Sequence, residues 1–175
     1  MHKKIETLIL KHKTKAMVRL KEVPSLSNIK TIGAICVLSS EENWNIVLEI
    51  LNSFNGTMQG VCLFCISQNK ALPLWIDKKQ ENIIFCTNKD LSLLRVPKKQ
   101  LLDNFIKKDF DLLINFDINN AFLPCYVSAL SKAKFKIGLD TEENRQYFDL
   151  LLNIKEPTFK EYSLQVVSYL SKINI

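Results

Sequence analysis

Residues 31–54 read TIGAICVLSSEENWNIVLEILNSF, and this stretch decides the fold. Residues 31–38 form a continuous apolar run with the length of a buried strand. Ser39 and Glu42 follow at capping-box spacing, which predicts that a helix begins there. The helix is expected to end at Asn55–Gly56, a common C-terminal signal, and its apolar face consists of Trp44, Val47, Ile50, Leu51 and Phe54.

The same alternation continues along the rest of the chain. Further apolar runs of strand length lie at 60–67, 82–87, 111–116 and 135–139, and a sixth strand is expected at 147–154. Helices are expected at 98–107, from Phe122 to Leu130 and from Phe159 to Ile173. Strands that alternate with amphipathic helices form a parallel sheet covered on both faces. We therefore predict an α/β fold, a Rossmann-like three-layer sandwich of five to six mostly parallel strands, as a single domain over residues 25–175. The connection between the second and third strands lacks a helical pattern, so we expect it to be irregular.

A basic arm precedes this domain. Residues 1–22 carry seven basic and two acidic side chains, which leaves the rest of the 175-residue chain, of net charge +6, close to neutral. Over residues 2–21 the apolar stripe of Ile5, Ile9, His12, Ala16 and Leu20 lies beside a basic stripe of Lys4, Lys11, Lys15 and Arg19. This spacing predicts an amphipathic N-terminal helix, ended by Pro24, so that residues 1–24 form a separate segment.

The basic stripe favours anionic partners. Lys4, Lys11, Lys15 and Arg19 could bind a protein or the phosphates of RNA, although a Lys-rich helix can also be a simple solvated face. Aromatic residues are not interleaved with these lysines, so RNA binding would be independent of base sequence. Peripheral membrane contact is a weaker alternative, because the apolar stripe lacks Trp and Phe.

Composition and cysteine spacing exclude several classes of protein. An apolar content of 47% is too high for a disordered chain. The basic start leads into Leu8–Leu10 and then Lys11, too short for the core of a secretory signal, so we expect a cytoplasmic protein with free thiols. Cys62 and Cys65 have redox or zinc spacing, but on a strand they point to opposite faces, so we expect no metal site.

Ligands of open parallel sheets bind beyond the carboxyl ends of the strands. The candidate crevice residues there are Ser39, Ser40, Asn119, Asp140 and Arg145. The first such loop has no glycine and carries two carboxylates, which argues against a bound dinucleotide or P-loop nucleotide, and we expect no cofactor. The body contains no histidine and no nucleophile elbow, so Asp117 and Glu41 are the candidate catalytic groups, with helix capping as the alternative role of Asp117.

Two segments carry a resemblance. Residues 110–117 (FDLLINFD) and 129–138 (ALSKAKFKIG) are similar to the N-terminal half of heptosyltransferase-type glycosyltransferases, and also to a group of short bacterial proteins known only as a domain of unknown function. The resemblance implies a Rossmann-like fold. Those transferases have a Gly-Asp turn where this chain has Leu38–Glu41, and they use a second domain to hold the nucleotide sugar. The resemblance therefore argues against independent glycosyl transfer.

These observations favour a non-catalytic cytoplasmic binding or scaffold protein that acts through its basic N-terminal helix or its strand-end crevice. One alternative is a glycosyltransferase-related half-domain, with Asp117 and Glu41 as bases and a separate chain as donor domain. Another is an RNA- or ribosome-associated protein that uses the basic arm on phosphates.

Overall fold

A computed structural model describes residues 2–25, 28–53, 60–77 and 82–172. They form one six-stranded, fully parallel sheet in the order β3-β2-β1-β4-β5-β6. The strands are β1 Thr31–Val37, β2 Gly60–Ile66, β3 Ile83–Cys86, β4 Leu112–Asn115, β5 Phe135–Leu139 and β6 Leu150–Leu152. The helices are α1 His2–Thr14, α2 Glu41–Ser53, α3 Lys99–Ile106, α4 Phe122–Leu130 and α5 Phe159–Lys172, with 3-10 turns η2 at Asn88–Asp90 and η3 at Asn144–Gln146.

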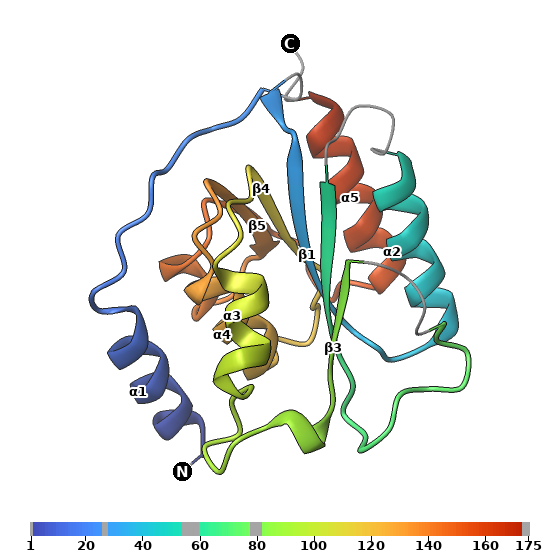
Figure 1. Cartoon of the computed structure of the whole chain (residues 1–175). Coiled ribbons are helices and arrows are strands. Elements are labelled where there is room, and N and C mark those ends of the chain that lie inside the picture. Colours follow the sequence, from blue (N-terminus) through green and yellow to red (C-terminus); the bar gives the residue numbers. More distant parts are fainter. Residues whose placement is uncertain (1, 26–27, 54–59, 78–81, 173–175) are drawn as a thin grey trace.

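The sheet lies between two layers of helices (Figure 1). Helices α2 and α5 cover one face, and α1, α3 and α4 cover the other. Side chains of each strand alternate between the two cores because successive residues of a strand point to opposite faces. Thus Cys65 belongs to the core under α2 and α5, and Cys62 to the core under α3 and α4. The predicted three-layer Rossmann-like fold and the opposite orientation of these two cysteines are confirmed.

Other features of the predicted fold also agree with the structure. Residues 67–77, between β2 and β3, contain no helix, as expected. Strand β6 is shorter than the predicted segment, because the amides of Tyr147 and Phe148 donate to the Asn144 carbonyl of the preceding turn. The predicted end of α2 at Asn55–Gly56 lies outside the described residues.

The N-terminal arm departs from the prediction. Helix α1 ends at Thr14, and residues 17–25 run as irregular chain towards the start of β1, so Arg19 does not lie on the helix (Figure 1). The predicted apolar stripe is only partly the buried one: Ile9 packs against the core that contains Leu10, which is 5% exposed, while Ile5 and Leu20 are exposed. The helix stops because the chain beyond it is held by contacts to the amino ends of β5 and β6, described below.

Candidate functional site

The topology places a switch point between β1 and β4. These two strands are central neighbours, and the sheet is extended on one side by β2 and on the other by β5. In such sheets the crevice beyond the carboxyl ends of the two strands is the usual ligand site. The loops after β1 and β4 therefore decide what chemistry this edge can support.

The loop after β1 serves to start α2. The Ser40 hydroxyl accepts a hydrogen bond from the Asn43 amide at 3.2 Å, and the Ser39 hydroxyl accepts one from the Asn43 side-chain amide at 3.0 Å. Ser40 is thus the N-capping residue of α2, which begins at Glu41. The predicted capping box between Ser39 and Glu42 is wrong, because the cap lies one residue later. Glu41 lies exposed in the first turn of α2.

Asp117, after β4, is buried and shapes its own loop. Its carboxylate accepts hydrogen bonds from the backbone amides of Ala121, at 2.6 Å, and Asn119, at 3.2 Å. Burial raises the pKa of Asp117, and these two amide bonds oppose the rise. Ala121 immediately precedes α4, so both carboxylate oxygens hold the entry of the chain into that helix.

Of the remaining crevice candidates, Asp140 and Arg145 pair with each other. Arg145 forms an ion pair with Asp140 through two hydrogen bonds, of 2.7 and 3.2 Å, on the loop after β5. Asn119 contributes its backbone amide to Asp117. Among the contacts of the described residues, no hydrogen bond or ion pair joins Asp117, Glu41 and the Asp140–Arg145 pair. The expected crevice residues therefore form separate local clusters.

A cavity of about 920 Å³ lies at this edge, beneath α1. It opens between α1 and the loops that follow β4 and β5, and its walls include Lys4, Leu8, Leu10, Asn120, Phe122 and Glu143. Lys3 forms an ion pair of 2.7 Å with Glu143, and the Asn120 side chain donates to the same carboxylate at 2.7 Å. These two contacts lower the pKa of Glu143 to about 2, so this side chain is negatively charged at neutral pH. Sequence reasoning missed this cavity because it depends on where α1 docks.

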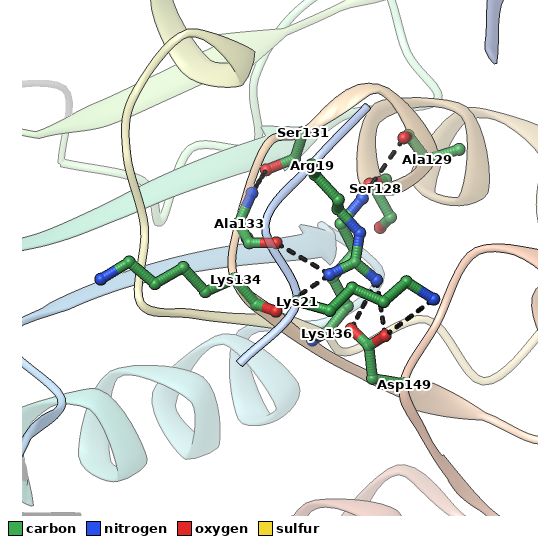
Figure 2. Close-up of polar contacts among 9 residues, drawn as sticks. All are labelled: Arg19, Lys21, Ser128, Ala129, Ser131, Ala133, Lys134, Lys136 and Asp149. Atoms are coloured by element: carbon green, nitrogen blue, oxygen red, sulfur yellow. Dashed lines mark hydrogen bonds and ion pairs between the residues drawn. The ribbon is translucent and has the colours of Figure 1, made fainter. Parts of the chain in front are cut away.

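The arm is anchored by Arg19 (Figure 2). Both oxygens of Asp149 accept hydrogen bonds from the Arg19 guanidinium at 2.6 Å, and each of the two side chains is 11% exposed. The guanidinium also donates to the carbonyls of Ala133, at 3.1 Å, and Lys134, at 2.9 Å. This part-buried ion pair, in which one guanidinium nitrogen donates to both carboxylate oxygens, holds the arm to the ends of β5 and β6. The structure thus corrects the assignment of Arg19: it pairs within the chain, whereas Lys4, Lys11 and Lys15 are exposed.

Lys136 is the second group that sequence reasoning missed. It is 1% exposed, and its ammonium donates to the carbonyls of Ser128, at 2.7 Å, and Ala129, at 3.3 Å, near the end of α4 (Figure 2). Burial, reinforced by the charge of Arg19, lowers the pKa of Lys136 to about 7. The available signal was a lysine within the otherwise apolar strand FKIGL, since strands of a parallel sheet are buried on both faces.

The described ranges contain neither a metal-ligand cluster nor a membrane-spanning helix. Within them, no group of three or more His, Cys, Asp or Glu side chains is placed to hold a metal ion. The sulfur atoms of Cys36 and Cys65 are 3.4 Å apart on neighbouring strands, and burial raises the pKa of the Cys65 thiol. None of the helices in the same ranges is both long and apolar enough to cross a membrane.

Comparison with known proteins supports the fold and names a family. No curated protein matches the chain. The solved structure of E. coli heptosyltransferase WaaC with ADP is similar, with a TM-score of 0.50 and 13% identity. The match covers 79% of this chain and 46% of that protein, so the chain spans about half the length of this structural neighbour and the likeness extends to the fold alone. The model of a family of unknown function, DUF6913, matches residues 1–173, and the chain therefore belongs to that family.

Proposed function

We propose that this protein is a non-catalytic cytoplasmic binding protein that recognises an acidic protein surface through the solvent face of α1. This face is defined by Lys4, Leu8 and Lys11, which are spaced one and two turns apart on one side of the helix and also border the cavity beneath α1. The single observation that carries the proposal is the composition of this face: Leu8 is 66% exposed between two exposed lysines.

The chemistry of this face selects the class of partner. Two ammonium groups attract carboxylates, and an exposed leucine between them gains free energy only when an apolar surface covers it. Residues 2–25 contain no Phe, Tyr or Trp on which a nucleotide base could stack. An acidic protein surface with apolar side chains supplies both contacts, so we favour it over RNA.

The strand-end carboxylates give less support to an enzyme. A catalytic base must reach the substrate. Asp117 is only 5% exposed and both of its oxygens hold the backbone of its own loop, while Glu41 lies exposed on a different loop. The five free, buried cysteines fit the reducing compartment that the proposal assumes.

The test compares two double variants of equal charge change. Lys4→Glu/Lys11→Glu reverses the proposed face, whereas Lys160→Glu/Lys172→Glu reverses two exposed lysines of α5. Proteins retained from nuclease-treated cytosol by the wild-type chain are purified, and their direct binding is measured by calorimetry at low and high salt.

We expect a direct partner whose binding weakens at high salt, is lost in Lys4→Glu/Lys11→Glu and persists in the α5 variant. Equal binding by both variants contradicts the proposal. If the chain retains partners from untreated cytosol but none after nuclease treatment, the RNA alternative is supported instead.

A further inference from the structure

A second cavity, of about 610 Å³, lies under the arm and shares only Lys11 with the solvent face of α1. It is bounded by the end of α1, the arm, α4 and β5, and its lining carries five basic side chains: Lys11, Lys15, Arg19, Lys21 and Lys136. No acidic residue is part of this lining. Its volume falls within the range of about 300–1,000 Å³ that is typical of small-molecule sites.

The charge around the cavity is not balanced from within the chain. Asp149 is the carboxylate next to it, and its oxygens are already engaged by Arg19 at 2.6 Å and by Lys21 at 3.5 Å. The backbone amide of Lys136 donates to the same carboxylate at 3.0 Å. One carboxylate thus faces several cations, and the excess positive charge points to an anionic ligand.

We propose that this cavity binds the phosphate group of a small phosphorylated molecule, held by Lys136 at its base and by Lys15 and Lys21 at its rim. This site goes beyond the proposed function, because it uses the inner side of the arm. Phosphate oxygens are strong acceptors and match several cationic donors at once.

Lys136 has a hydrogen-bond donor to offer. An ammonium group has three N–H bonds, and the carbonyls of Ser128 and Ala129 accept two of them. Lys136 lines the cavity and is 1% exposed, and its third N–H, which neither carbonyl uses, is the donor that the proposal assigns to an oxyanion. Its position at the floor is fixed by β5 and α4, so little side-chain entropy is lost on binding.

Binding should also be linked to the protonation of Lys136. The groups that act on its charge are Arg19 and Lys21 from the arm, Asp149 before β6 and Cys125 from α4, and with burial they bring its pKa to about 7. A bound anion favours the charged ammonium and so raises this pKa. Affinity for an anion of constant charge should therefore fall as pH rises through neutrality.

The experiment titrates the full chain with inorganic phosphate, and with sulfate as the anion that does not titrate near neutral pH. Sodium chloride holds the ionic strength constant, and amide NMR shifts report both the site and the Kd. The variants are Lys136→Met, Lys21→Met, whose side chain is 68% exposed in the wild type, and the control Lys160→Met on α5.

We expect saturable shifts in residues 15–21 and 129–136, a Kd raised about tenfold or more by Lys136→Met, and a smaller rise from Lys21→Met. Lys160→Met should bind as the wild type does. The pH dependence of sulfate binding should vanish in Lys136→Met.

Three outcomes overturn the proposal: no saturable shift in the wild type, equal Kd values in all variants, or shifts spread over surface lysines generally. None of them bears on the protein partner of α1, because Lys136→Met and Lys21→Met leave Lys4, Leu8 and Lys11 unchanged. Failure of this site and failure of the proposed function are therefore distinguishable.

Discussion

At the scale of single residues, two glycines of the sheet show how tightly the strands are packed. A Cβ atom on Gly33 would lie 2.7 Å from the Phe110 ring and 2.9 Å from Leu113, and both of these side chains are buried. A Cβ atom on Gly60 would meet nothing within 4 Å. Glycine is thus required at Gly33 by close packing, while Gly60 only adds flexibility to the unfolded chain.

We therefore expect Gly33→Ala to lower the free energy of unfolding by about 1–3 kcal/mol through overpacking. Gly60→Ala is the matched control and should be neutral or stabilising by about 0.5 kcal/mol. Urea denaturation of both variants measures these values. If both substitutions change the free energy of unfolding equally, the side chains of Phe110 and Leu113 can move to accommodate the added methyl group at position 33.

At the scale of elements, α1 is attached more weakly than the other helices. Leu10 is its buried side chain, whereas α2 buries Trp44, Val47, Ile50 and Leu51. The arm beyond α1 is then held by the pair between Arg19 and Asp149. Helix α1 should accordingly open locally at lower free energy than the sheet.

Leu10→Ala should cost about 2 kcal/mol or more of docking free energy. Hydrogen exchange should then accelerate in α1 and stay slow in β1 and β4. Leu8→Ala, on the solvent face, provides the control and should leave exchange unchanged. Uniform acceleration across the sheet would instead make α1 part of the cooperative core.

At the scale of the whole molecule, Lys136 links stability to pH. Its pKa is about 7 in the folded state and 10.5 ordinarily, so between these values the unfolded chain holds the proton that the folded chain releases. The contribution of Lys136 to the free energy of unfolding therefore increases as pH rises through that window, by up to about 1.4 kcal/mol per pH unit. Below pH 7 Lys136 is charged in the folded protein as well, and the full free-energy cost of burying this charge lowers the stability of the fold.

Lys136→Met removes this dependence. The variant should be more stable than the wild type at pH 6, because a buried charge is replaced by an apolar side chain of similar length, and this advantage should shrink as pH rises from about 7 towards 10.5. Chemical denaturation at several pH values measures the difference. If the difference in stability between variant and wild type does not change with pH, Lys136 is protonated in the folded protein as it is in the unfolded chain.

The sequence by itself determined the layered parallel fold, the strand positions and the opposite orientation of Cys62 and Cys65. Each follows from short-range periodicity, since a strand repeats every two residues and a helix every 3.6. It could not determine where the arm runs, because Arg19 is held by Asp149, 130 positions away in the chain. The role of Lys136 and both cavities likewise arose only from tertiary structure, because burial and long-range pairing depend on contacts that no local pattern encodes.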